Sequence, residues 1–172
     1  PSGCGKTTTL QMIAGLVEPT SGTITLDGRD ITRQAPSRRG LGIVFQSYAL
    51  WPHMDVAQNI AYPLKARRTD SGAIPARVRE ALQMVDLAGF ETRRVDELSG
   101  GQRQRVWVAM VLAQQTPLLL LDEPTTFLDI AHQIDLMELL TDLNEQGTTL
   151  VAVLHDLNQA ARYATHLIAM KD

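Results

Sequence analysis

The feature that most constrains the fold is an uninterrupted run of four leucines, at 118–121, that leads directly into two acidic residues. No polar residue alternates with the leucines, which is typical of a strand buried on both faces of a parallel sheet. Ligands of α/β proteins bind in the crevice beyond the carboxyl ends of such strands. We therefore expect Asp122 and Glu123 to face a ligand. The alternative, an exposed acidic turn closed by Pro124, does not explain why a buried strand precedes the two acids.

A phosphate-binding pattern at the start of the chain adds a second constraint. The full pattern is a glycine, four further residues, Gly-Lys, and then serine or threonine. Gly5, Lys6 and Thr7 match it, whereas its first glycine would lie one position before Pro1, so we expect the chain to be a fragment. Glycines let backbone N–H groups turn toward phosphate oxygens, and the helix that begins near Thr7 adds its positive end. A glycine-rich turn without a ligand is the alternative, and the later motifs disfavour it.

These residue types assign separate tasks to neighbouring side chains. Lys6 is expected to reach the β- and γ-phosphates of a nucleotide, and Thr7 to bind Mg²⁺. Asp122 is expected to hold the same Mg²⁺ directly or through water, and Glu123 to polarise the attacking water. The segment predicted to surround the phosphates consists of Ser2, Gly3, Cys4, Gly5, Lys6, Thr7 and Thr8.

Hydrophobic periodicity predicts strands and helices that alternate along the chain. Helical spacing predicts helices at 7–16, 100–114 and 130–143, and a mostly helical part between 56 and 89. Short apolar runs predict strands at 41–45, 118–121, 150–154 and 167–170. The alternating segment 23–26 meets Asp27-Gly28, which is a hairpin turn signal. This order predicts an α/β fold with a mainly parallel sheet and a small antiparallel part, without internal repeats or linkers.

Composition excludes several classes of function. The net charge is −3, so the chain has no overall excess of positive charge that would indicate nucleic-acid binding. Its one cysteine, Cys4, cannot form an internal disulfide and fits a reducing cytosol. No apolar run approaches the roughly 18 residues that span a bilayer. If a membrane is involved, this chain is not expected to cross it.

The most specific motif is Leu98-Ser99-Gly100-Gly101-Gln102, which precedes the acidic strand. It matches the signature of the ATP-binding cassette (ABC) family, and the chain resembles that family over nearly its whole length. Gln46 matches the family's Q-loop, Asp129 its D-loop and His155 its switch histidine. The resemblance implies a P-loop NTPase fold with ATP and Mg²⁺ as cofactors.

The resemblance also implies how the chain is organised. Residues 1–172 are expected to form a single ABC ATPase domain, incomplete at both ends, with a helical subdomain at roughly 50–98 that leads into the signature. Two subunits would sandwich two ATP molecules head to tail, so the signature of one meets the γ-phosphate held by Lys6 of the other. Ser99 offers a hydroxyl, Gly101 an unobstructed N–H, and the following helix a positive N-terminus.

The roles that the resemblance implies divide into four sets. The catalytic residues are Glu123, His155 and Gln46, and the Mg²⁺ ligands are Thr7, Gln46 and Asp122. The residues that act on the partner's ATP are Ser99, Gly100, Gly101 and Gln102, and the residue at the dimer interface is Asp129.

Two parts of the chain resemble importers of different kinds. Residues 46–53 are similar to importers of ferric iron, polyamines and sugars, whereas 123–133 and 154–160 are similar to ferric-siderophore importers. Iron is the overlap, so ferric iron or a ferric siderophore is the expected cargo, with a polyamine, a sugar or cobalamin as alternatives. A DNA-repair ABC ATPase would carry a coiled-coil or zinc-binding insertion, and 47–98 shows neither heptads nor a cysteine cluster. A translation factor or a non-catalytic cassette is a further alternative.

The expected partners are a second ATPase subunit, membrane permease subunits and, indirectly, a substrate-binding protein, but no nucleic acid. The expected location is the cytoplasmic face of the bacterial inner membrane, as a peripheral subunit. Tyr48, Leu50 and Trp51 are either core residues or part of a groove for the permease. Arg105 is either a source of positive field at the signature or a solvated charge, and His132 is interpreted as a surface or interface residue.

Overall fold

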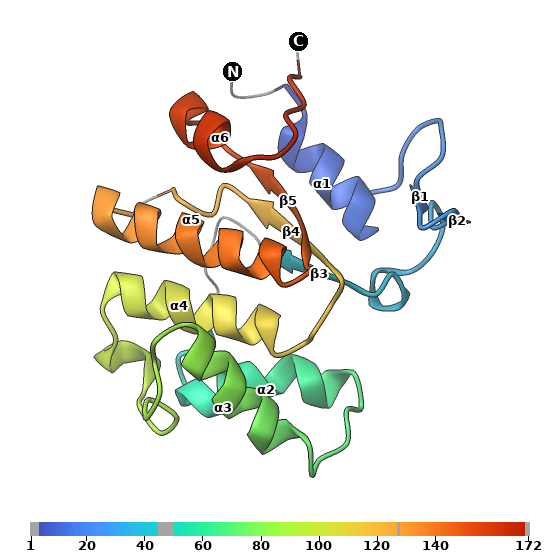
Figure 1. Cartoon of the computed structure of the whole chain (residues 1–172). Helices are drawn as coiled ribbons and strands as arrows, with labels where there is room; N and C mark the ends of the chain where they lie inside the picture. Colours follow the sequence, from blue (N-terminus) through green and yellow to red (C-terminus); the bar gives the residue numbers. More distant parts are fainter. Residues whose placement is uncertain (1–3, 45–49, 127, 171–172) are drawn as a thin grey trace.

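A three-stranded parallel sheet forms the centre of the molecule (Figure 1). The computed structural model describes residues 4–44, 50–126 and 128–170. The strand order is β3 (Leu41–Val44), β4 (Leu118–Asp122) and β5 (Thr149–Val153). Strand β4 lies in the middle, with Leu118 opposite Leu41 on one side and Thr149 on the other. The predicted parallel sheet is confirmed.

Strand β4 is buried on both faces, as its sequence predicts. One face, with Leu118 and Leu120, contacts α1 (Lys6–Ala14) through Leu10 and Ala14. The other face, with Leu119 and Leu121, belongs to a larger core shared with the helical part of the chain. Figure 1 shows α1 on one side of the sheet, and α4 (Gly100–Leu112) and α5 (Ile130–Glu145) on the other.

A helical subdomain packs on the outer side of α4. It contains α2 (Val56–Ala66), α3 (Ile74–Met84) and the short 3₁₀ helix η2 (Val95–Glu97). Both α2 and α3 contact α4, and all three helices contribute fully buried side chains to one core. The part predicted as mostly helical is therefore two helices, of which α2 begins at a capping box formed by Asp55 and Gln58.

One buried amide holds the segment that enters this subdomain. The Asn59 side chain is completely buried and accepts a hydrogen bond from the Trp51 N–H at 2.8 Å. Its Nδ2 donates to the carbonyl of Trp51 at 3.2 Å and to that of Asp55 at 2.9 Å. Residues 51–55 are thus fastened to the second turn of α2.

The small antiparallel sheet joins β1 (Thr25–Leu26) to β2 (Arg29–Asp30). Asp27 and Gly28 both have positive φ, 49° and 74°, as a two-residue hairpin turn requires. This hairpin was predicted, and it is confirmed.

Arg39 connects the small β part to the end of α1. It is 5% exposed, and its guanidinium donates to the carbonyls of Met12 at 2.7 Å and Ile13 at 2.8 Å. It also donates to the carbonyls of Thr32 and Gln34, each at 2.8 Å. The positive charge therefore lies at the negative end of the helix, where it is stabilised. Gly15 ends α1 in the left-handed conformation, which glycine adopts at low cost.

Near the end of the chain, the structure differs from the sequence-based expectations. The apolar run 167–170 is not a strand: Leu167 is 64% exposed and Ile168 is 91% exposed. A strand is stable only when its backbone groups are paired, and within the described residues this run pairs with no other strand. Helix α6 (Leu157–Tyr163) precedes this run and was not among the predicted elements; it is capped by Asp156, whose carboxylate accepts from the Asn158 N–H at 2.7 Å.

Candidate active site

The start of α1 meets the end of β4 at one edge of the sheet. The Thr7 hydroxyl donates to Asp122 Oδ1 at 3.0 Å, although the two residues are 115 positions apart. Gly5 precedes the helix with a φ of 83°, which favours glycine, and it has no side chain to cap the helix. The N–H groups of the first turn therefore remain suited to an anion such as phosphate.

Lys6 stands at the first position of α1, as the phosphate-binding pattern predicts. Its Nζ donates to Cys4 Sγ at 2.9 Å, so the lysine folds back over the loop that precedes the helix. Thr8 is exposed beside it. Ser2, Gly3 and Gln46 lie outside the residues that the structure describes.

Glu123 and His155 form a pair at the ends of two neighbouring strands. His155 Nε2 lies 2.5 Å from Glu123 Oε1, and the Thr126 hydroxyl donates to Glu123 Oε2 at 3.1 Å. Glu123 has a φ of 51°, in the left-handed region, and its N–H donates to the Val153 carbonyl at 3.2 Å. Such a conformation is uncommon for a non-glycine residue, and it occurs preferentially at functional sites. The contacts with His155 and Thr126 hold both carboxylate oxygens of Glu123 in place.

Asp122 lies in an environment that disfavours its charge. Burial raises the pKa of its carboxyl above the ordinary value, and the neighbouring Glu123 acts in the same direction. The hydrogen bond from Thr7 and the nearby His155 act against this increase in the pKa. A cation beside Asp122 would compensate for the cost of the buried charge.

The donor set suits Mg²⁺. The Thr7 hydroxyl and the Asp122 carboxylate place two oxygens within 3.0 Å of each other, and oxygen is the ligand that Mg²⁺ prefers. Across the described ranges, no three side chains of the types His, Cys, Asp and Glu converge on one point.

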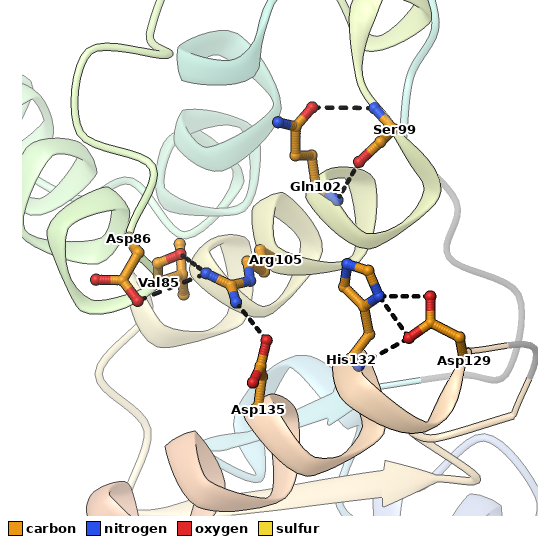
Figure 2. Close-up of polar contacts among 8 residues, drawn as sticks. All are labelled: Val85, Asp86, Ser99, Gln102, Arg105, Asp129, His132 and Asp135. Atoms are coloured by element: carbon orange, nitrogen blue, oxygen red, sulfur yellow. Dashed lines mark hydrogen bonds and ion pairs between the residues drawn. The ribbon is translucent and has the colours of Figure 1, made fainter.

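The signature segment forms the beginning of α4, as predicted. The Ser99 hydroxyl accepts from the Gln102 N–H at 3.2 Å, and the Gln102 side chain accepts from the Ser99 N–H at 3.0 Å (Figure 2). This capping box fixes the first turn. A side chain at Gly100 would meet no atom, whereas one at Gly101 would collide with His132.

The two halves of the expected site lie apart in one chain. Figure 1 shows the start of α1 and the start of α4 at different ends of the molecule, with α5 between them. Within this chain, the signature therefore does not meet the segment that carries Lys6. That separation is what a site shared between two subunits requires.

A profile of the ABC transporter family matches residues 1–126 of this sequence. The chain belongs to the ABC transporter family. The match includes the phosphate-binding segment, the signature and the acidic strand end.

Bacterial import proteins of this family are similar to the chain. It is 49% identical over 171 residues to a spermidine/putrescine import ATP-binding protein, PotA, of Acidothermus cellulolyticus. It is 47% identical over 183 residues to the ferric enterobactin transport ATP-binding protein FepC of Escherichia coli K12. It is 52% identical over 171 residues to a sulfate/thiosulfate import ATP-binding protein, CysA 2, of Chromobacterium violaceum. The alignments cover 99–100% of the chain, which spans 45%, 66% and 46% of these relatives' lengths.

Solved ABC cassettes share the fold. The dimeric post-hydrolysis structure of the cassette MJ0796, bound to ADP and Pi, has a TM-score of 0.80 and is 36% identical to the chain. The match covers 93% of this chain and 74% of that one. The predicted fold, a parallel sheet with a small antiparallel part and a helical subdomain, is confirmed. No helix in the described parts of the chain is both long and apolar enough to cross a membrane.

Sequence reasoning missed some residues of this ABC cassette that organise its site. Gln104 is buried in α4, and its Nε2 donates to the Pro124 carbonyl at 2.7 Å, so it fastens α4 to the segment after Glu123. A glutamine on the apolar side of a helix was the available signal. Arg105 makes ion pairs with Asp86 at 3.5 Å and Asp135 at 3.0 Å. Neither sequence-based interpretation of this arginine, as a positive field at the signature or as a solvated charge, included these pairs.

Asp129 has a partner within its own chain. It caps the start of α5, where its carboxylate accepts from the His132 N–H at 2.9 Å and lies 2.7 Å from His132 Nδ1. The backbone hydrogen bond, followed by the side-chain contact, lowers the pKa of Asp129 below its ordinary value. In the sequence, the signal for this contact was an aspartate, Asp129, three residues before His132 at the predicted start of a helix.

Proposed function

We propose that this chain is the part of a bacterial ABC import ATPase that binds Mg-ATP and hydrolyses its terminal phosphate bond. The observation that carries the proposal is the meeting of Thr7 with Asp122, beside the pair of Glu123 and His155, at one edge of the sheet. This edge places a helix N-terminus, a lysine, two carboxylates and an imidazole where a nucleotide can bind.

Each side chain has a task in an in-line attack of water on the γ-phosphorus. Glu123 orients the water and accepts its proton, since both of its oxygens are held by hydrogen bonds. His155, paired with that carboxylate, would stabilise the charge on the γ-phosphoryl group as it is transferred to water and ADP leaves, and Lys6 would contact the β- and γ-phosphates. Thr7 and Asp122 would hold Mg²⁺, which neutralises charge on the phosphate oxygens when it is bound. Gln46 is assigned to the catalytic set and to Mg²⁺ from its sequence alone.

The complete site requires a second subunit. Ser99, Gly100, Gly101 and Gln102 would contact the γ-phosphate bound to the partner, and Asp129 would lie at the interface between the subunits. The distance between the two half-sites in Figure 1 supports this arrangement, as does the similarity to a cassette solved as a dimer. Closure on ATP and opening after hydrolysis would then drive the membrane subunits.

The surface proposed for the permease lies on the helical subdomain. Trp51 is half-buried, and its ring lies 4.2 Å from that of Tyr62, which is 44% exposed. Between α2 and α3 runs a groove of about 740 Å³, whose apolar lining includes Ala57, Ala61 and Val78. Trp51 and Tyr62 do not line this groove, and we assign the surface around these two aromatic residues to a short helix of a permease subunit, with a substrate-binding protein acting indirectly through it. The subunit would then be peripheral, on the cytoplasmic side of the inner membrane.

Ferric iron or a ferric siderophore is the cargo we propose. The similarity of residues 123–133 and 154–160 to siderophore importers supports it, as does the likeness to FepC. Relatives named for polyamine and sulfate import are about as similar, so polyamine and sulfate are the competing cargoes. Uptake of labelled ferric siderophore, spermidine and sulfate by cells with and without the gene distinguishes the three.

A mixing experiment tests the hydrolytic proposal. Full-length Lys6→Ala and Ser99→Arg proteins are each expected to hydrolyse no ATP, because each lesion affects both sites of a homodimer. In the mixed dimer one site carries both lesions and the other carries neither, so phosphate release should partly return. Demonstrated mixed dimers that remain inactive would argue against the shared site.

A further inference from the structure

His132 lies between two segments to which the proposed function gives separate tasks. Its ring Nδ1 is 2.7 Å from both carboxylate oxygens of Asp129, and its backbone N–H donates to Asp129 Oδ1 at 2.9 Å. Figure 2 shows the imidazole of His132 extending from α5 toward α4, with Asp129 on one side of the ring. The carboxylate of Asp129 is therefore held by the backbone and the side chain of the same residue.

The other edge of the same ring covers Gly101 of the signature. A Cβ atom added to Gly101 would lie 2.5 Å from His132 Nε2, which is closer than such atoms approach. The backbone of Gly101 is ordinary helix, so its conformation does not require glycine. What requires glycine in this structure is the imidazole, which occupies the space that a larger residue would fill.

A second contact joins the same two helices one turn further along. Arg105 Nη2 on α4 lies 3.0 Å from Asp135 Oδ2 on α5, and Nη1 donates to the Val85 carbonyl at 3.3 Å (Figure 2). Residues 101 and 105 of α4 thus face residues 132 and 135 of α5. Because α4 and α5 contact each other through side chains at two successive turns, a movement of α4 against α5 would alter both contacts.

We propose that His132 is a positioning residue that holds Asp129 and the signature segment in one fixed relationship, so that a displacement of either segment moves the other. The proposal rests on the proposed function, in which Asp129 lies at the subunit interface and the signature contacts the partner's ATP. Histidine fits this place because Nδ1 on one edge of the ring contacts the Asp129 carboxylate, while Cδ2 and Nε2 on the other edge occupy the space beside Gly101. Asparagine can keep the first contact but is too short to keep the second.

Kinetics of the full-length protein test the positioning role. His132→Ala is expected to lower kcat on the order of 10-fold while the KM for ATP changes less than about 2-fold, because the phosphate-binding segment at Lys6 is untouched. His132→Asn should retain part of the rate by bonding Asp129. The matched control is His166→Ala, which removes an exposed imidazole that contacts the hydroxyl of the adjacent Thr165, and it should match the unchanged protein. A kcat for His132→Ala within about 2-fold of the unchanged protein overturns the proposal.

A double-mutant cycle tests the contact without relying on hydrolysis. In an ordinary helical conformation, glycine to alanine raises the thermal midpoint of unfolding. Gly101→Ala is expected to lower the midpoint when His132 is present and to raise it in the His132→Ala background, where the space is vacant. The same change in both backgrounds shows that the ring does not cover Gly101, and it overturns the proposal.

These two measurements also separate the proposal from the function on which it rests. If the unchanged full-length protein hydrolyses no ATP, the proposed function fails and the positioning role fails with it, whereas the thermal cycle still reports the contact. A different outcome would refute the positioning role alone. The protein would hydrolyse ATP, and Gly101→Ala would change the thermal midpoint in opposite directions with and without His132. If the kcat of His132→Ala then falls only in proportion to the fraction of the protein that is folded, His132 is a stabilising residue and the positioning role is wrong.

Discussion

The Thr7 hydroxyl and the Asp122 carboxylate meet at 3.0 Å across 115 positions of the sequence. This contact joins the helix after the phosphate-binding segment to the strand that ends in two acids. It brings two oxygens suitable for one cation within 3.0 Å of each other, and Lys6 and Glu123 are the neighbours in sequence of these two residues. The energetic cost of the site is concentrated at Asp122, whose carboxyl is buried.

Asp122→Asn is expected to stabilise the protein when nucleotide and metal are absent. Because the pKa of Asp122 is raised in the folded state, the folded protein binds this proton more tightly than the unfolded chain. The stability that protonated Asp122 contributes is therefore fully present below the ordinary pKa of aspartate, about 4. It is lost as the pH rises through the raised pKa that Asp122 has in the folded protein. The thermal midpoint of the variant should exceed that of the unchanged protein at pH 7, and the difference should shrink as the pH falls.

The same variant should lose the stabilisation that Mg-ATP provides. The unchanged protein is expected to unfold at a higher temperature with Mg-ATP than without it, since a ligand that binds only the folded state raises its stability. Asp122→Asn should show little of this increase. A variant that is less stable than the unchanged protein at every pH would contradict the assignment of a costly buried charge.

Glu123→Gln is expected to keep ATP binding and to lose hydrolysis on the order of 10²-fold or more. The amide has nearly the same size and can still bond to Thr126 and His155, but it cannot accept the proton of the attacking water. Steady-state phosphate release measures the loss. Glu145→Gln, the same change at an exposed position, is the control and should leave the rate unchanged. A Glu123→Gln rate within a few-fold of the unchanged protein would remove Glu123 from the catalytic role.

Trp51→Ala should weaken assembly with the permease more than it weakens the fold. The half-buried ring is lost, but the hydrogen bonds between Trp51 and Asn59 use backbone atoms and remain. Truncation of a large aromatic at a binding hot spot costs about 2 kcal/mol or more of binding free energy. Trp107→Ala is the contrasting variant: Trp107 is buried, and its loss should cost about 3–5 kcal/mol of the unfolding free energy. Co-purification with the permease and urea unfolding separate the two effects, and a Trp51→Ala protein that unfolds but still assembles would identify Trp51 as core.

Arg39→Ala should destabilise the protein by about 2–4 kcal/mol, because the carbonyls that it bonds at the end of α1 and in the small β part lose a charged donor. The neighbouring Arg38 is exposed, and Arg38→Ala should change the unfolding free energy by less than about 0.5 kcal/mol. Urea unfolding of both variants is the measurement. Equal effects would show that the charge of Arg39, and not its bonds, matters.

The sequence predicted those parts of the fold and site whose physical cause is local. A run of leucines is buried on both faces wherever a parallel sheet contains it, and Asp27-Gly28 turns a hairpin by its own backbone preferences. The phosphate-binding segment and the signature both begin helices, as predicted, because their glycine and serine residues suit a helix start.

The remaining features depend on what lies across the fold. The run 167–170 is as apolar as a strand, but whether it forms one depends on a neighbouring backbone that sequence periodicity does not report. Similarly, no pattern in α4 shows that Gly101 is covered by a ring from α5, or that Arg105 reaches Asp135 thirty positions later. Those relationships arise only when the two helices pack together.

Asn59 separates the course of the chain from the side chains that the chain carries. It holds the entry to α2 through the backbone atoms of Trp51 and Met54, so the path of that segment does not depend on which side chains those two positions carry. Substitutions at positions 51 and 54 therefore change the side chains that this segment presents, while a single buried amide keeps the backbone beneath them in place.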